Sequence, residues 1–257
     1  MKKPVVVAVP LRLRYTEWMG CGSCVESWHR FLRCWAEAFA REHKKRSGVA
    51  PAAHGHLTVM NGIAPEMLPP DCLEIRRREV EIHTAEHRLG LTLPPSYRAF
   101  LQAFPRGHHV AAGEGEHRGF FPPAQIDRLE KLAPVLLARF EEAPVEAGLH
   151  EYCTYGVDQN PGWFRTRYLR EAIVIGRYAD DAGNLILLHP QERSRDGGME
   201  AGLLFSDGEY RAPLLVELMR QLCHREIFAL DAMPPYLAQI VDETGVCPLG
   251  LCDTWWA

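Results

Sequence analysis

The chain has 257 residues, of which 47% are hydrophobic and 24% are charged. This composition is that of an ordinary globular protein, and it excludes a disordered or membrane-embedded chain. The net charge of −4 hides an asymmetry, because residues 1–140 carry 20 Lys and Arg against 14 Asp and Glu, whereas residues 141–257 carry 9 Arg, no Lys and 19 Asp and Glu. A lysine-free acidic half argues against binding a phosphate backbone, and it suits a basic protein partner or plain solvation equally well.

No apolar run approaches the ~20 residues of a membrane-spanning helix. The short apolar run near the N-terminus is broken by Arg12 and Arg14, so it does not form the core of a signal peptide. We therefore expect a cytoplasmic protein that contacts no membrane, and its eight cysteines are expected to be reduced thiols.

The N-terminal part predicts a strand over 4–15, a long amphipathic helix over 23–46 and a short strand over 57–60. The Pro-rich stretch 61–71 then reads as a connector. Residues 1–66 are therefore expected to form a strand-helix-strand extension that packs on a main domain.

The stretch 73–104 predicts two consecutive helices. Gly90 stands where a left-handed helix end is needed, and Pro94 and Pro95 open the second helix with φ already fixed. Tyr97 and Phe100 begin the apolar stripe of that second helix.

The remainder predicts helices over 122–137 and 213–228 and strands over 172–178, 184–189 and 202–205. Asp/Gly-type turns over 179–183 and 206–208 follow two of these strands, and 144–163 reads as loop. Runs of helices followed by runs of strands favour an α+β fold with a mainly antiparallel sheet. The main domain is assigned to 72–228, followed by a Pro- and Cys-containing tail, 229–257.

The helix pair resembles the opening signature of the SUKH superfamily, named for the yeast cell-wall regulator, Syd and herpesvirus homology. The matching residues are Ala85-Glu86, Leu89-Gly90, Leu93-Pro94, Tyr97 and Phe100-Leu101. The later order of a hairpin, another strand and a closing helix is also similar, so the resemblance covers roughly residues 72–228. It implies a SUKH-like α+β domain.

Two local motifs suggest metal or redox chemistry. Cys21 and Cys24 form a C-x-x-C pair ahead of a predicted helix, which fits either a thiol-redox pair or half of a zinc site. His83, Glu86 and His87 fit the H-x-x-E-H pattern of inverted zinc peptidases. Small half-buried thiols and surface histidines explain the same residues, so we predict no catalytic residue, no metal and no cofactor.

The resemblance implies an immunity protein of a bacterial polymorphic toxin system, such as an inhibitor of a type VI secretion effector. Such a protein binds a cognate toxin, often a nuclease, and blocks it without binding nucleic acid itself. The alternatives are a thiol-redox or zinc-dependent protein built on Cys21 and Cys24, and a regulatory scaffold. The acidic half predicts the partner contact, with Tyr as aromatic anchors. The candidate contact residues are Asp180, Asp181, Glu200, Asp207, Glu209, Tyr178 and Tyr210.

Overall fold

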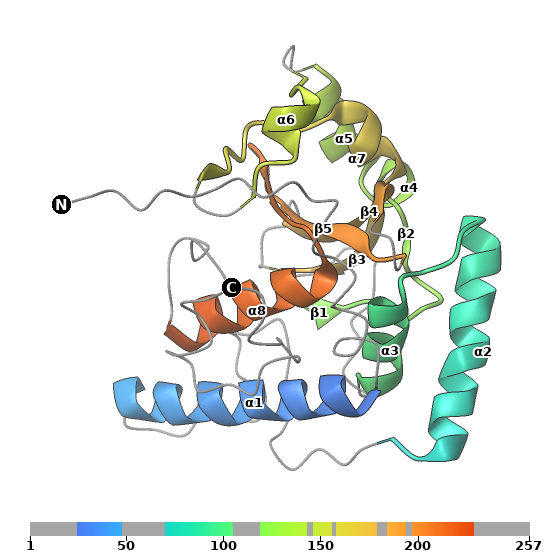
Figure 1. Ribbon diagram of the computed structural model, residues 1–257, viewed down its shortest axis with the longest axis vertical. Coiled ribbons are helices and arrows are strands. Elements are labelled where there is room, and N and C mark those ends of the chain that lie inside the picture. Colours follow the sequence, from blue (N-terminus) through green and yellow to red (C-terminus); the bar gives the residue numbers. More distant parts are fainter. Residues whose placement is uncertain are drawn as a thin grey trace, which may run out of the picture.

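The computed structural model describes residues 25–47, 70–104, 119–142, 146–155, 158–178, 184–193 and 197–228. Within these ranges helices flank an antiparallel sheet (Figure 1), which confirms the predicted α+β class. The predicted strands 4–15 and 57–60, the turn 179–183 and the tail 229–257 lie outside the described residues. No helix among the described residues is long and apolar enough to cross a bilayer.

The sheet has the strand order β1-β3-β4-β5-β6, and β2 also pairs with β3. Every pairing is antiparallel, and the centre of the sheet is buried on both faces. The strands are β1 Gly119–Phe120, β2 Asp127–Arg128, β3 Ile173–Arg177, β4 Leu185–Arg193, β5 Met199–Leu204 and β6 Glu209–Ala212.

The helices cover the sheet in two groups, which Figure 1 shows above and below it. Helices α1 and α3 contact α8, and α8 lies against β5 and β6. On the other side α4, α5 and α7 contact one another, and α7 lies against β4. The helices are α1 Val25–Ser47, α2 Cys72–Leu89, α3 Pro95–Ala103, α4 Leu129–Leu132, α5 Pro134–Glu141, α6 Leu149–Tyr152, α7 Thr166–Glu171 and α8 Leu215–Phe228.

A chain of aromatic rings joins α1, α3 and the sheet. The ring centroids of Trp28 and Phe100 are 5.1 Å apart, and those of Phe100 and Phe120 are 4.6 Å apart, both edge to face. All three side chains are fully buried. Such pairs contribute roughly 0.5–1.5 kcal/mol each beyond the burial of their area. Helix α1 therefore shares one hydrophobic core with the rest of the described chain.

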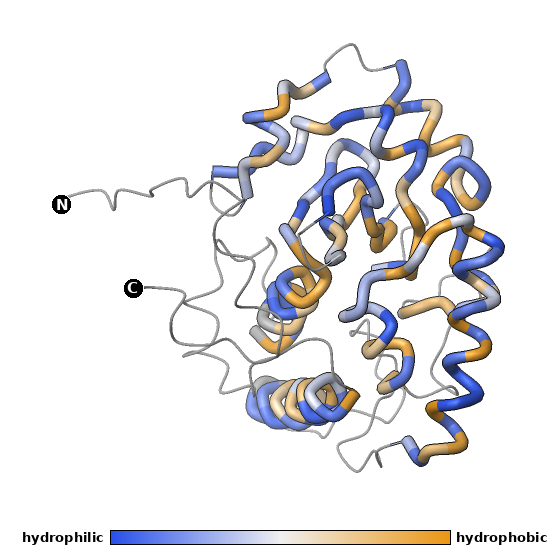
Figure 2. Tube along the Cα trace, turned by 45° about the vertical axis from the view of Figure 1, so that its right-hand side comes forward, coloured by the Kyte–Doolittle hydropathy of each residue, from blue (hydrophilic) through white to orange (hydrophobic). Residues whose placement is uncertain are grey.

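Helix α2 lies at the periphery against α3, and Figure 2 shows hydrophilic residues along much of its length. Its start is capped by Asp71, which accepts a hydrogen bond from the Glu74 N–H at 2.8 Å. Its end is the left-handed Gly90, with φ +68°. The predicted break at Gly90 and the restart at Pro95 are both confirmed.

One buried arginine joins the two helices at their other end. The Nε and Nη2 of Arg78 donate to Glu74 Oε1, at 3.1 and 2.9 Å. Its Nη1 donates to the carbonyl oxygens of Gln102 and, at 2.6 Å, Phe104. These carbonyls end α3 without intrahelical partners, so Arg78 satisfies polar groups that would otherwise be buried unpaired.

The single helix predicted over 122–137 is only partly correct, because the structure has two shorter helices, α4 and α5, from residue 129 onward. Residues 123–125 form a turn, β2 pairs with β3, and α4 ends at Ala133 before Pro134 restarts the chain as α5. Pro134 cannot continue a helix hydrogen-bond pattern, and Ala133 adopts φ −145°. The region 144–163 expected to be loop contains α6, and the sequence interpretation also missed α7 and β6.

Replacing Gly90 tests the left-handed end of α2. A Cβ at this position meets no atom within 4 Å, so the cost of Gly90→Ala is conformational alone. We expect the free energy of unfolding to fall by about 1 kcal/mol, and by less for Gly90→Asn, because Asn tolerates this conformation better. Urea denaturation of the full chain measures both, and an unchanged midpoint for Gly90→Ala would contradict this helix end.

Candidate binding site

Four charged side chains and a tyrosine meet on one face of the sheet, in the interior of the protein. His189 of β4 and Glu209 of β6 approach across β5, with Nε2 and Oε1 2.6 Å apart. Arg211 Nη1 lies 3.2 Å from Glu200 Oε1, and the Tyr152 hydroxyl donates to Glu200 Oε2 at 2.6 Å. The side chains of both ion pairs are at most 1% exposed. We call these five residues the buried charge network.

Strand periodicity and one glycine make this arrangement possible. Glu200 and Gly202 lie on the same face of β5, and their neighbours on β4 and β6 include His189 and Arg211. A Cβ on Gly202 would lie 2.0 Å from Glu209 Oε1 and 3.2 Å from His189 Nε2. The missing side chain at Gly202 is therefore the space through which His189 and Glu209 reach each other.

Burial and neighbouring charges set the protonation of the network. Burial alone would lower the pKa of His189, but the charge of Glu209 and the hydrogen bond to it outweigh burial and raise that pKa. Burial raises the pKa of Glu200, an effect that His189 and Arg211 oppose. The pKa of Tyr152 is also raised by burial, so its hydroxyl keeps its proton and donates.

The network holds the segment that contains α6 against the sheet. The Arg211 guanidinium lies over the Tyr152 ring, 3.8 Å from its centroid, and donates to the Tyr152 carbonyl. The Gln159 side-chain amide bonds both backbone groups of Arg211, at 2.9 and 2.7 Å. The Pro161 carbonyl accepts from the Glu209 N–H at 2.8 Å. This segment therefore occupies the outer edge of β6, where an added strand would otherwise pair.

The predicted contact residues divide between interior and surface. Glu200 and Glu209 are buried, 1% and 0% exposed, so their carboxylates pair inside the protein, and the expectation that they face a partner does not fit this placement. Asp207 is exposed in the turn between β5 and β6. Tyr178 and Tyr210 are half-buried, and Asp180 and Asp181 lie outside the described residues.

The sequence interpretation missed Tyr152, His189 and Arg211, the partners of these two glutamates. Glu200 stands in a strand whose other residues are all apolar or Gly, and His189 ends a run of four apolar residues. A charged residue inside such a run is almost never buried without a partner. An acidic residue in one apolar strand and a basic residue in the next could therefore have indicated a buried ion pair.

The metal-site motif on α2 is used differently in the structure. His83 and His87 are exposed; Glu86 Oε2 lies 3.3 Å from His83 Nδ1, whereas Glu86 Oε1 contacts α3. Glu86 Oε1 accepts from the Leu93 N–H at 2.9 Å and pairs with Arg98 Nη1 at 2.5 Å. Glu86 thus holds the link between the two helices. No cluster of three His, Cys, Asp or Glu suited to a metal occurs in the described ranges, and Cys21 and Cys24 lie outside them.

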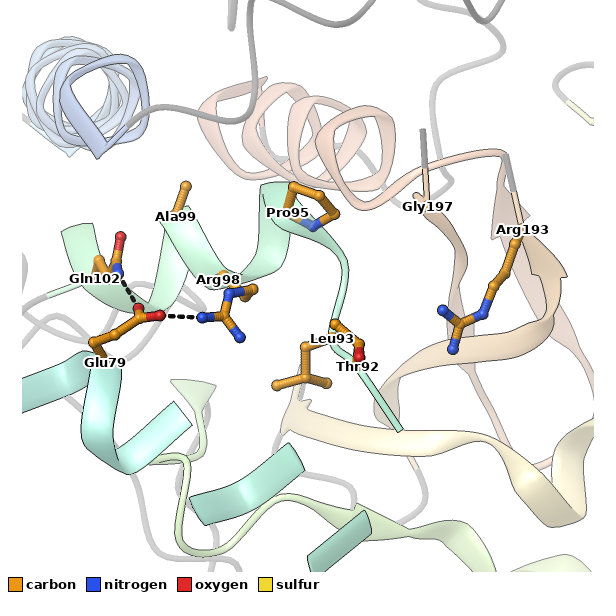
Figure 3. A pocket seen from close by; sticks show the side chains of 9 residues that line it. All are labelled: Glu79, Thr92, Leu93, Pro95, Arg98, Ala99, Gln102, Arg193 and Gly197. Carbon is orange, nitrogen blue, oxygen red and sulfur yellow. Dashed lines mark hydrogen bonds and ion pairs between the residues drawn. The ribbon is translucent and has the colours of Figure 1, made fainter. Parts of the chain in front are cut away.

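An open pocket of about 540 Å³ lies where α3 faces the far end of the β4–β5 hairpin. Figure 3 shows Arg98 and Gln102 on one wall, both directed toward Glu79 of α2, and Arg193 of β4 on the opposite wall. The sequence interpretation did not single out any of these residues. The volume of the pocket falls within the range of roughly 300–1,000 Å³ that is usual for binding pockets.

These features define an α+β domain with an internally paired polar core and a solvent-open pocket at one end of its sheet. The model of the SMI1 / KNR4 family (SUKH-1) matches residues 78–213, just over half of the chain. The chain therefore belongs to this family, and the resemblance drawn from the helix pair is confirmed. No curated protein and no solved structure gave a match.

The structure explains the signature residues of the helix pair. Ala85, Leu93, Tyr97 and Phe100 are buried, at most 1% exposed. Gly90 supplies the left-handed turn and Glu86 binds the linker amide. Each position serves to hold α2, the linker and α3 together.

The buried charge network predicts a stability that falls as pH rises. A His whose folded-state pKa is raised contributes stability below its unfolded pKa, about 6.5, and loses it as pH rises through the folded value. We therefore expect His189→Gln to destabilise the chain more at pH 5.5 than at pH 8. Urea denaturation at a series of pH values measures the difference between the two proteins.

His189→Gln must be compared with a control variant, because other ionisable groups also make the free energy of unfolding of the wild type depend on pH. Burial raises the pKa of Glu217 to about 7, so Glu217 also favours the folded state at low pH. The exposed His87 supplies the matched control, and His87→Gln should destabilise the chain much less than His189→Gln does at pH 5.5. A destabilisation by His189→Gln that is equal at pH 5.5 and pH 8 would contradict the charged pairing with Glu209.

Proposed function

We propose that this chain is an immunity protein that binds and neutralises a secreted bacterial toxin in the cytoplasm of the cell that makes it. The observation that carries the proposal is membership of the SMI1 / KNR4 family (SUKH-1) over residues 78–213, a superfamily to which many immunity proteins belong. In this proposal the chain acts by occupying the toxin's surface and not by chemistry of its own.

The state of the ionisable residues supports a binding role. The buried charge network brings His, Glu, Arg and Tyr side chains together, and these groups are closed to solvent. A general acid or base must lie within hydrogen-bond reach of its substrate. Groups that are sealed in the interior suit a rigid binding scaffold better than a reaction.

The surface that we propose for a basic partner is the end of the sheet near the β5–β6 turn. Asp207 is exposed there, and the rings of Phe205 and Tyr210 pack edge to face with centroids 5.6 Å apart. Tyr178, which follows β3, receives the Arg225 guanidinium 5.0 Å above its ring. A carboxylate beside half-buried aromatic rings offers both charge complementarity and an anchor.

The first experiment identifies the partner. We expect a native pull-down with this chain, followed by mass spectrometry, to recover a large protein that ends in a toxin domain. That domain expressed alone should stop growth, and co-expression of this chain should restore it. A recovered partner whose expression is harmless, or whose toxicity this chain does not relieve, would overturn the proposal.

Charge reversal tests the proposed acidic surface. Asp207→Lys should lower the association rate for the toxin about tenfold at low salt, with a smaller effect at 0.5 M salt, because screening weakens charge steering. Glu130→Lys, at an exposed acid of α4, is the control with the same change in charge. Surface plasmon resonance measures both association rates, and equal rates for the two variants would show that Asp207 is not part of the interface.

A further inference from the structure

The pocket between α3 and the end of β4 has an apolar floor. Leu93, Pro95 and Ala99 line it, and Leu93 and Ala99 are themselves almost fully buried, 1% and 3% exposed. Gly197, at φ +82°, closes the side toward β5 without adding a side chain. Of these three residues Pro95 is the exposed one, so it offers most of the apolar contact area.

The α3 wall of the pocket is polar, and its one cation, Arg98, is already paired. Arg98 pairs with Glu79 through Nη2 and with Glu86 through Nη1. The second oxygen of Glu79, Oε2, accepts from the Gln102 side-chain amide at 2.5 Å. One cation is thus held between two carboxylates, and this wall has no positive charge left for a ligand.

The opposite wall carries the available cation. Arg193 is exposed, and its Nε donates to the Pro190 carbonyl at 3.1 Å, which fixes the base of the guanidinium. With the residues that the structure describes, Arg193 forms no ion pair. Figure 3 shows its guanidinium directed across the gap toward Thr92 and Leu93. A planar guanidinium with both Nη atoms presented binds a carboxylate through two parallel hydrogen bonds.

We propose that this pocket binds an acidic side chain of a partner protein, with its carboxylate on Arg193 and its aliphatic stem on Leu93, Pro95 and Ala99. A single cation above an apolar floor matches one carboxylate on an aliphatic stem better than a phosphate backbone, which requires clustered cations. This inference deepens the proposed function, since the partner is the neutralised protein, and the pocket supplies an anchor site separate from Asp207.

Short peptides test the chemistry of the pocket without the partner. The probe is N-acetyl-Leu-Glu-Leu-amide, and its neutral counterpart is N-acetyl-Leu-Gln-Leu-amide. Titrations of the full chain, followed by the backbone amide NMR shifts of Ala99 and Gly197, give both dissociation constants. We expect the Glu peptide to bind about tenfold more tightly, because charge-assisted hydrogen bonds are roughly twice as strong as neutral ones.

Two variants test whether Arg193 is the cause of the preference for the Glu peptide. Arg193→Gln should reduce the ratio of the two dissociation constants to about one, whereas Arg139→Gln, at an exposed arginine of α5, should leave it unchanged. Equal affinities for both peptides, no shifts at Ala99 and Gly197 at about 20 mM peptide, or tighter binding of inorganic phosphate than of the Glu peptide would each overturn the inference.

The protection assay separates this inference from the proposed function. Arg193→Glu should lose protection against the toxin, and Arg139→Glu should keep it. If wild-type chain protects and Arg193→Glu protects equally well, the pocket is not the anchor site and the inference fails alone. If wild-type chain protects against no toxin, the proposed function fails, and the peptide titrations still decide whether the pocket selects a carboxylate.

Discussion

The mutual neutralisation of charges inside the protein is the constraint on which the rest of the structure depends. Glu200 and Glu209 stand on a sheet that is buried on both faces, where an unpaired carboxylate would cost several kcal/mol. Arg211 and His189 from the neighbouring strands make this burial tolerable. Because Glu209 and Arg211 both stand on β6, a slip of β6 by one residue would leave all four unpaired. The network therefore favours a single register.

The same principle governs the helix pair. Arg78 and Arg98 each join α2 to α3, and each is bound to a Glu of α2. Both arginines are consequently paired within the chain and are not available to a partner, although they stand in the basic half of the sequence. In both halves of the sequence, the number of formal charges is therefore larger than the number of charges available at the surface. Among the described residues, Arg193 and Asp207 are two charged groups that stay exposed.

Local chemistry made the helix pair predictable from the sequence. Gly90 and Pro95 act through their own backbone preferences, so no knowledge of the tertiary structure was needed to place them. The single helix expected over 122–137 failed because its apolar spacing was followed across Pro134, which ends one helix and begins the next. The antiparallel sheet was predictable from its apolar runs, whereas β6, with Tyr and Arg among its four residues, gave no such run.

The candidate site was harder to predict because burial is a tertiary property. An acidic residue beside a turn is usually exposed, and Asp207 follows this rule, but Glu209 two residues later points into the sheet. Strand alternation does not separate the two, because residues two positions apart face the same side of a strand. Asp207 is exposed because it lies in the turn before β6 begins at Glu209. The pocket is formed by α3 and the β4–β5 hairpin, about 95 residues apart in sequence, and no spacing within either segment indicates it.

The positions of Asp207 and Arg193 relate the two proposed contacts. Arg193 pairs with Met199 at the start of β5, and Asp207 follows the end of the same strand. Six strand residues at about 3.3 Å each separate these ends by roughly 20 Å. An interface of ordinary size covers about 800 Å² per partner and is wide enough to reach both. A toxin that presents a basic patch to Asp207 and one acidic anchor to Arg193 would thus be recognised by charge pattern as well as by shape, and a partner that carries only one of these features would be discriminated against.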